Sequence, residues 1–314
     1  MHIEELVTKI QPLSKEIIKA AQKRFDNLIK PVGSLARLES MTTRYAGIIG
    51  SSDKQLVIIP ETRLLLLWGE AKHAAEIEAA MLHKKAITVY AAHVNAKVIP
   101  LLVIGETAYD LLEEGAMLTG EYIGEEKAGL VCLGTCEKEL RSDWKDFLEE
   151  EDGLAFLDRL QCPSVSAMTG AVLQAAGMRV PVMLDGLATC LAALAAAKFN
   201  PYVLQYCFAG DESAEAGCSE LLQRMQLQAP LRLSLNNAEG VGALTCLQLF
   251  DAGIKTYTEM ETFEEAGVHN EKEDYSLKVQ EDIKKSHCGN TAEVIDSGEG
   301  TCCCPEQQKE ENHG

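Results

Sequence analysis

The sequence predicts an α/β protein built on a parallel β-sheet flanked by helices. Short apolar runs that suit buried strands alternate with longer stretches of helical periodicity, and such alternation is typical of strands joined by right-handed crossovers. The chain has 314 residues, of which 46% are hydrophobic, so one large or two ordinary domains can bury a sizeable core. No internal repeat is visible, which argues against a solenoid.

The N-terminal residues predict helices joined by a turn. Residues 1–28 place apolar side chains at three- and four-residue spacing, and Ser14 is a suitable N-cap within this stretch. Pro31 cannot continue a helix. We therefore expect a second helix over residues 35–49, with Ser34 as its N-cap.

Strands and helices then alternate along the chain. Buried strands are expected at residues 63–68, 97–105, 128–133, 180–184, 202–208 and 231–235. Helices are expected between and after them, at residues 70–95, 109–113, 165–177, 187–198, 213–225 and 243–257. Pro100 marks the second of these strands as an edge strand or a bulge. The charged segment 141–153 is the best candidate for an internal boundary.

The composition excludes several classes of protein. A net charge of -19 repels both nucleic acid and acidic membrane surfaces, so local Lys, Arg or backbone N–H groups must hold any phosphate-bearing ligand. The N-terminus lacks the apolar core of a signal peptide, and the longest apolar runs are too short to span a membrane. The 11 cysteines lie mostly in apolar runs of a long chain, which favours reduced thiols. We therefore expect a cytoplasmic protein.

A carboxylate followed by two glycines stands where the apolar run 231–235 gives way to a helical pattern. These residues are Glu239, Gly240 and Gly242. Glycines at such a junction let a ligand approach the backbone and leave the first helical N–H groups free. Active sites of α/β folds gather at strand ends, which favours a ligand role for Glu239. An ordinary turn with a solvated acid is the alternative that the motif alone leaves open.

Two further acids follow predicted strands. Asp185 and Gly186 come directly after the strand at 180–184, which is a favoured place for ligand contact. A role for Asp185 as the cap of the next helix explains this position equally well. Ser213 and Glu215 lie where a helix is expected to begin, and acids there also suit the helix dipole.

Metal binding and nucleotide hydrolysis have little support in the sequence. No C-x-x-C pair occurs among the cysteines and histidines near the C-terminus, and Cys132 with Cys136 lacks a second pair. Neither a G-x-x-x-x-G-K-[ST] loop nor a G-x-S-x-G elbow is present, and no G-x-G-x-x-G follows a strand. We predict no metal site. Residues 269–314 lack apolar periodicity and predict an acidic, Cys-rich, largely disordered tail, with a thiol- or metal-handling role as a minor alternative.

Several ordered stretches carry a family resemblance. The stretch KPVGSLARLE at 30–39 is close to K-P-P-G-S-L-G-R-L-E, and EGVGA at 239–243 is similar to E-G-[TS]-G-A. Between them come AMTG at 167–170, PVMLDG at 181–186 and SAEAG at 213–217. In this order the stretches resemble the nicotinate-nucleotide–dimethylbenzimidazole phosphoribosyltransferase family, which serves lower-ligand synthesis for cobalamin.

The resemblance implies a reaction and an architecture. The reaction is transfer of phosphoribose from nicotinate mononucleotide to 5,6-dimethylbenzimidazole, which gives α-ribazole 5′-phosphate and nicotinate without any cofactor. The family is typically a homodimer with a Rossmann-like sheet and a small helical domain built from the chain ends. For this chain it implies a helical segment at 1–50, a core at 51–268 and the appended tail at 269–314.

The resemblance also implies roles for individual residues. Glu239 corresponds to a general base that takes the benzimidazole N–H proton as the other ring nitrogen attacks the anomeric carbon. Contacts to the substrates are implied for the following residues: Lys30, Gly33, Ser34, Arg37, Asp185, Gly186, Ser213, Glu215, Gly240 and Gly242.

The chain departs from the family at the phosphate end of the site. Where the family has a glutamate- and glycine-rich stretch ending in Asn-Thr-Thr, residues 132–144 read CLGTCEKELRSDW, and a following segment with a lysine is missing. The family's Asp-His-Gly element is replaced by WGEAKH at 68–73. The alternative to an active enzyme is therefore an inactive paralogue that binds a benzimidazole or corrinoid precursor, or a partner subunit.

Overall fold

The computed structural model describes residues 2–138, 140–236 and 239–268. The described residues up to Ala266 belong to one compact unit. The predicted tail at 269–314 lies outside the described residues. The division of the chain at residues 50 and 268 stays a prediction.

A five-stranded parallel sheet forms the centre of the unit, with the strand order β2-β1-β3-β4-β5. The strands are β1 (Arg63–Gly69), β2 (Ala96–Leu102), β3 (Leu130–Thr135), β4 (Val182–Leu184) and β5 (Cys207–Ala209). Every residue of β1 and β3 is buried, as expected for central strands that helices cover on both faces. The α/β prediction is confirmed, and so is the edge position of the strand that contains Pro100.

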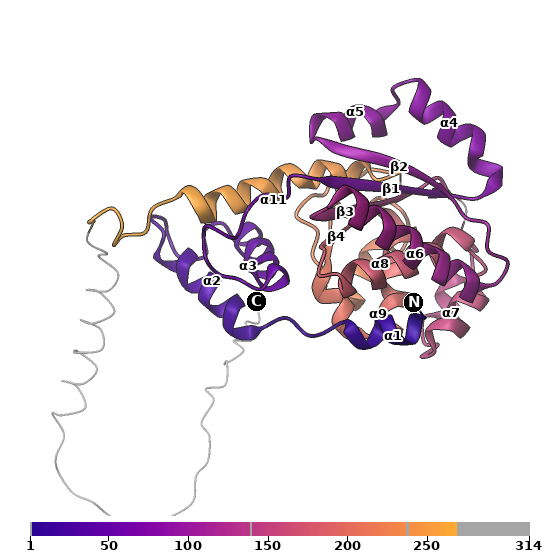
Figure 1. Cartoon of the computed structure of the whole chain (residues 1–314), viewed down its shortest axis with the longest axis horizontal. Coiled ribbons are helices and arrows are strands. Elements are labelled where there is room, and N and C mark those ends of the chain that lie inside the picture. The colour runs from indigo at the N-terminus through magenta and orange to yellow at the C-terminus, as the bar shows by residue number, and fades with distance from the viewer. Residues whose placement is uncertain (1, 139, 237–238, 269–314) are drawn as a thin grey trace, which may run out of the picture. The chain divides into compact units, whose positions relative to one another are not determined.

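Helices cover both faces of the sheet (Figure 1). On one side lie α1 (Ile3–Lys9), α6 (Ala108–Glu126), α7 (Gly153–Leu160), α8 (Pro163–Gly177) and α9 (Gly186–Phe199), and on the other α4 (Ala74–Leu82) and α5 (Ala86–His93). Helices α6 and α8 touch backbone to backbone, because a Cβ at Gly115 would lie 1.8 Å from the Ala167 carbonyl oxygen, and one at Gly170 would lie 2.0 Å from that of Leu112. Gly170 of the AMTG stretch therefore has a packing role.

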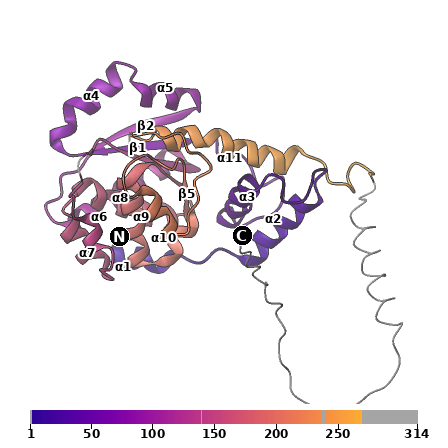
Figure 2. The same cartoon turned by 180° about the vertical axis from the view of Figure 1, so that it is seen from behind.

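A smaller helical group joins the two ends of the unit (Figure 2). Helices α2 (Lys15–Asn27) and α3 (Arg37–Ile49) pack against the far part of α11 (Val241–Glu259). The rings of Phe25 and Tyr257 lie 5.2 Å apart, and those of Tyr45 and Phe250 lie 5.1 Å apart. The small helical group that the family resemblance implies is thus present.

Three expectations for the N-terminal half were wrong. Residues 1–28 form two helices instead of one, because Pro12 interrupts the pattern; Ser14 does cap the second of them by accepting the Ile17 N–H. The predicted helix at 70–95 is split into a 3-10 turn, α4 and α5, with Lys84 in the left-handed region between the two helices. Ser34 is not the cap of α3, which begins after Ala36.

The C-terminal half also differs from expectation. Residues 231–235 form no strand, since Leu231 makes only an isolated bridge to Asp211. The helix expected at 213–225 is confined to α10 (Cys218–Arg224), because Gly217 has a φ of 99° and the segment before it is a loop. The strand expected at 202–208 begins as a 3-10 helix at Pro201 and becomes extended only at Cys207.

Candidate active site

A cavity of about 280 Å³ opens at the carboxyl ends of β3 and β4, the position where parallel α/β sheets bind ligands. Its wall comes from the segment after β3, from the start of α9 and from the loop that precedes α10. The first segment contributes Glu137, Lys138 and Arg141, and the third contributes Glu215. The wall of the cavity thus carries cationic side chains as well as carboxylates.

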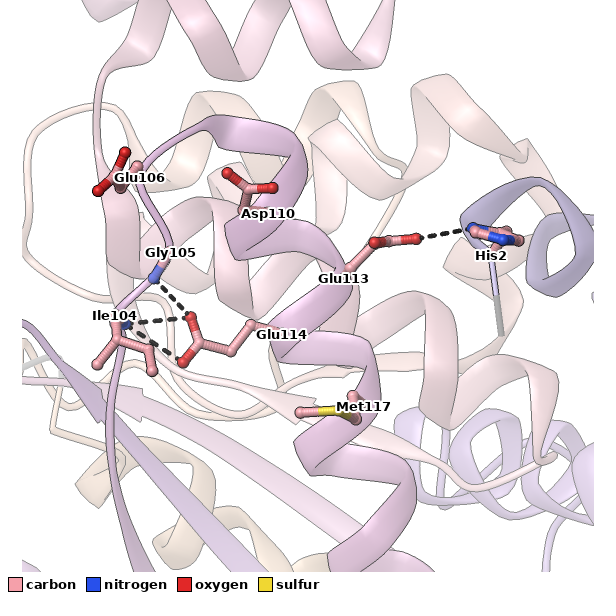
Figure 3. Close-up of a pocket in the computed structure, with 8 residues that line it drawn as sticks. All are labelled: His2, Ile104, Gly105, Glu106, Asp110, Glu113, Glu114 and Met117. Carbon is pink, nitrogen blue, oxygen red and sulfur yellow. Dashed lines mark hydrogen bonds and ion pairs between the residues drawn. The ribbon is translucent and has the colours of Figure 1, made fainter.

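A larger cavity of about 610 Å³ lies beside the first turns of α6 (Figure 3). Its carboxylates are engaged locally: Glu114 accepts the backbone N–H groups of Ile104 and Gly105, and Glu113 lies 3.3 Å from His2. It is lined by none of the predicted site residues, and its acidic wall repels an anionic nucleotide. We therefore place the candidate site in the smaller cavity.

Asp185 lies at the end of β4 and is only 1% exposed. It precedes α9, yet its side chain does not cap that helix. Instead, its Oδ2 accepts the backbone N–H groups of Gly240 and Gly242, each at 3.0 Å. Burial raises the pKa of Asp185 to about 7, against the opposing effect of these two hydrogen bonds, and the charges of Glu215 and Asp211 add to the rise.

Glu215 supplies the helix cap that Asp185 does not. Its Oε2 accepts the Leu187 N–H at 2.7 Å, in the first turn of α9, and the Ser213 hydroxyl at 3.1 Å. The Ser213 hydroxyl lies 3.0 Å from the Leu235 carbonyl as well. Ser213 and Glu215 therefore tie their loop to the segment that leads into Glu239.

Glu239 is 9% exposed, and its backbone packs against Gly134 of β3. A Cβ at Gly134 would come within 2.3 Å of the Glu239 carbonyl oxygen, so only glycine in β3 leaves room for this turn. Gly240 has a φ of 103°, which also favours glycine. Burial raises the pKa of the Cys136 thiol to about 12, and the nearby charges of Glu76 and Glu239 contribute to this.

Three cations lie in the cavity wall or pair with a residue of that wall, and each is paired with a carboxylate. Lys72 Nζ lies 3.0 Å from Glu137 and 3.2 Å from Glu70. Lys138 Nζ is 2.5 Å from Glu76, which raises the pKa of Lys138, and the charge of Glu239 contributes to the same shift. The third cation is Arg141, which forms a bidentate pair with Asp143.

Sequence reasoning did not select Glu137, Lys138 or Arg141 as site residues. The available signal was their place directly after the buried strand β3, whose carboxyl end faces the cavity. In the sequence, residues 132–144 stand out only as a departure from the family pattern, because they lack the family's own polar residues.

The structure does not place the N-terminal motif at this cavity. Lys30 Nζ pairs with Glu39 at 2.8 Å, and the Glu39 carboxylate also accepts the Leu35 N–H. Gly33 lies exposed in the intervening turn, as does Ser34. Arg37 donates to the Ala229 carbonyl in the connection between α10 and α11. Of the predicted site residues within the described part of the chain, Glu215 lines the cavity. The others are absent from its wall: Lys30, Gly33, Ser34, Arg37, Asp185, Gly186, Ser213, Glu239, Gly240 and Gly242.

The described residues contain no group of three or more His, Cys, Asp or Glu side chains that could hold a metal ion. The described cysteines are all free and buried. Within the same ranges, no helix combines the length and the apolar character needed to cross a bilayer.

Comparison with known proteins assigns the family. Residues 10–70 and 90–268 match a family model described as phosphoribosyltransferase, and these two ranges make up well over half of the chain. The chain belongs to this phosphoribosyltransferase family. The resemblance seen in the sequence is thereby confirmed, and the family makes the chain a transferase. The break at 71–89 covers the 3-10 turn, α4 and the start of α5, so the family model does not match this part of the chain.

Relatives agree with this assignment. A protein from Chloroflexus aggregans is 28% identical over 86% of this chain and 99% of its own length, and one from Geobacter sulfurreducens is 26% identical over 85% and 98%. Both are named nicotinate-nucleotide–dimethylbenzimidazole phosphoribosyltransferase. The first alignment spans 352 positions, more than the 314 residues of this chain, so that relative has segments that this family member lacks.

A crystal structure shows the same fold. The phosphoribosyltransferase of that name from Thermus thermophilus superposes with a TM-score of 0.70 over 82% of this chain and all of the other, at 20% identity.

Proposed function

We propose that this family member transfers phosphoribose from nicotinate mononucleotide to 5,6-dimethylbenzimidazole. The products are α-ribazole 5′-phosphate and nicotinate, as in the branch of cobalamin synthesis that makes the lower ligand. The observation that carries the proposal is the buried Glu239 on a glycine-bounded turn that packs against Gly134 near the carboxyl end of β3, with a charge that acts on Lys138 of the cavity wall. The names of the relatives support the choice of substrates.

Glu239 acts as the general base in this proposal. One benzimidazole nitrogen forms a bond to the anomeric carbon while the bond from that carbon to the nicotinate ring nitrogen breaks, and its electron pair neutralises the pyridinium. The proton on the other benzimidazole nitrogen passes to the Glu239 carboxylate. A positioned carboxylate contributes about 100- to 10,000-fold to such a step.

Lys138 and Arg141 hold the phosphate end of the nucleotide. Both line the cavity, and both belong to the segment after β3 where the phosphate-holding stretch of the family is replaced. Lys138 is paired with the half-buried Glu76, and Arg141 with the more exposed Asp143. A phosphate dianion can compete with both carboxylates for these cations. Lys30 is a weaker candidate, because it is enclosed with Glu39.

The other implied contacts stay proposals. Gly186, Gly240 and Gly242 are buried, and the N–H groups of the last two already donate to Asp185. Glu215 lines the cavity, and Ser213 donates a hydrogen bond to Glu215. We further propose a homodimer located in the cytoplasm, supported by the family resemblance and by the composition.

A chromatographic assay tests the function. Purified protein is incubated with nicotinate mononucleotide and dimethylbenzimidazole, and nicotinate and α-ribazole phosphate are quantified. The proposal predicts both products in equal amounts, and no nicotinate when the base is omitted. Binding of the base without any product would instead indicate an inactive paralogue.

A further inference from the structure

We propose that Asp185 is a positioning residue that holds the turn of Glu239 through the backbone N–H groups of Gly240 and Gly242. This inference rests on the proposed function of Glu239 as the base and gives Asp185 a role other than contact with a substrate. The two hydrogen bonds are each 3.0 Å long and join residues 55 and 57 positions apart in the sequence. They are the direct link from the end of β4 to the turn before α11.

The geometry makes Asp185 unsuited to a ligand contact. The side chain is 1% exposed, and Asp185 does not line the cavity, whereas Leu187 and Glu215 do. Its Oδ2 is occupied by the two N–H donors. The cap of α9 comes from Glu215, so helix capping does not explain why an acid stands at the end of β4.

Both positions of the turn require glycine, Gly242 because of the contact with Asp185 and Gly240 because of its own surroundings and backbone conformation. A Cβ at Gly242 would lie 2.3 Å from Asp185 Oδ1, so a larger residue would push the carboxylate away. A Cβ at Gly240 would lie 2.5 Å from Leu65 Cδ1 of β1, and the residue has a positive φ. In the pattern Glu-Gly-x-Gly the two glycines thus let the turn lie close to β1 and to Asp185, and the glutamate stands directly before the two N–H groups that donate to the buried carboxylate.

The surroundings of Asp185 disfavour its ionised form. Asp211 lies close by, since its Cβ is 2.9 Å from the position of a Cβ at Gly242, and its Oδ2 has no hydrogen-bond partner among the described residues. The charge of Glu215 also acts on Asp185. Burial above all raises the pKa of the Cys132 thiol in β3, the hydrogen bond with Cys218 above all raises that of Cys190 in α9, and the charge of Asp185 contributes to both rises. No cation partner of Asp185 is among the described ion pairs. An acid that opposes folding in this way and is still present points to a functional use.

The test compares Asp185→Asn with wild type in two measurements. Hydrogen exchange at the amides of residues 240–242 is expected to become at least tenfold faster, because a neutral amide oxygen is a weaker acceptor than a carboxylate. The kcat of nicotinate release is expected to fall about tenfold or more with little change in either KM, since displacement of the base slows the chemical step. The acid limb of the pH–rate profile should also move, because the variant no longer titrates at this position.

Asp251→Asn is the matched control. It is likewise an acid-to-amide change, at a residue within α11. It breaks the ion pair of Asp251 with Arg63, which are 2.8 Å apart, and leaves the hydrogen bonds of Asp185 to Gly240 and Gly242 in place. This variant is expected to lose stability and keep kcat. Unchanged exchange at 240–242 in folded Asp185→Asn would overturn the inference whatever the activity. Unchanged kcat, in a protein whose wild type is active, would overturn it as well; an inactive wild type would instead contradict the proposed function.

Discussion

Lys30 Nζ lies 2.8 Å from Glu39 Oε1, and the two side chains are 7% and 3% exposed. The first and last residues of the KPVGSLARLE stretch are thus joined to each other across the turn between α2 and α3. Burial alone would raise the pKa of Glu39, but hydrogen bonds from Lys30, the Leu35 N–H and Gln22 outweigh it and lower that pKa below 4.5. A motif that resembles a ligand-binding loop is therefore closed by a structural ion pair between its two ends.

Removal of one partner of this pair should destabilise the fold. Glu39→Gln leaves Lys30 charged and enclosed, and a cost of about 3 kcal/mol is expected in urea unfolding. Because the pKa of Glu39 is lowered in the folded state, its contribution is present above pH 4.5 and is lost as the pH falls through the folded pKa. The variant and wild type should therefore converge in stability in acid. A difference that stays constant down to pH 3 would contradict this account of the pair.

Gly134 should be indispensable to activity. In Gly134→Ala the added Cβ would meet the Glu239 carbonyl oxygen at 2.3 Å, so the turn must move off β3. We expect kcat to fall about 100-fold, as misplacement of a catalytic group by about 1 Å costs that much. Gly124→Ala in α6 is the control, since nothing lies within 4 Å of its Cβ, and it should keep full activity with up to about 1 kcal/mol of added stability.

Lys138→Gln and Arg141→Gln should each weaken nucleotide binding. The KM for nicotinate mononucleotide is expected to rise about tenfold, with the KM for dimethylbenzimidazole unchanged, and the effect should shrink at high salt because the contact is exposed. Lys97→Gln serves as control: Lys97 is comparably exposed and pairs with Glu126 at 2.5 Å, away from the cavity. Equal effects of all three substitutions would point to the net charge of the protein and not to a phosphate site.

Asp185→Asn should stabilise the protein while it slows the reaction. The pKa of Asp185 is raised from 3.8 to about 7, so the folded state binds the proton more tightly than the unfolded state between these values, and stability falls as the pH rises through this window. The variant lacks this loss. Its melting temperature should exceed that of wild type at pH 8, and by less at pH 5. A lower melting temperature at pH 8 would show that the ionised acid stabilises the fold.

Local patterns predicted the elements that local chemistry decides. Alternation of apolar runs predicted the parallel sheet, Pro100 predicted an edge strand and Ser14 predicted a helix cap. Residues 231–235 have the composition of a strand, but Leu231 pairs only by an isolated bridge to Asp211, beyond the end of β5, and the sequence does not show this. Likewise, helical periodicity over 70–95 does not reveal the left-handed Lys84 that ends α4.

The site was predictable in its parts but not in its connections. Glu239 and Asp185 stood out as acids at strand ends, yet nothing in either segment shows that the second holds the turn of the first, because the two N–H groups lie 55 and 57 residues away. Lys138 and Arg141 were not selected, because a cation after a strand becomes a site residue only when the sheet order places it beside β4 and the loop of Glu215.

The most direct test of the central claim is the rate of nicotinate release by Glu239→Gln at saturating concentrations of both substrates. The account predicts a fall in kcat of about 100-fold or more, with the KM for nicotinate mononucleotide preserved and with normal folding. Glu212→Gln, which alters a half-buried acid paired with the exposed Arg232 in a neighbouring loop, should leave kcat unchanged. If Glu239→Gln released nicotinate and formed α-ribazole phosphate at the wild-type rate, Glu239 would not be the base and the proposed mechanism would be wrong.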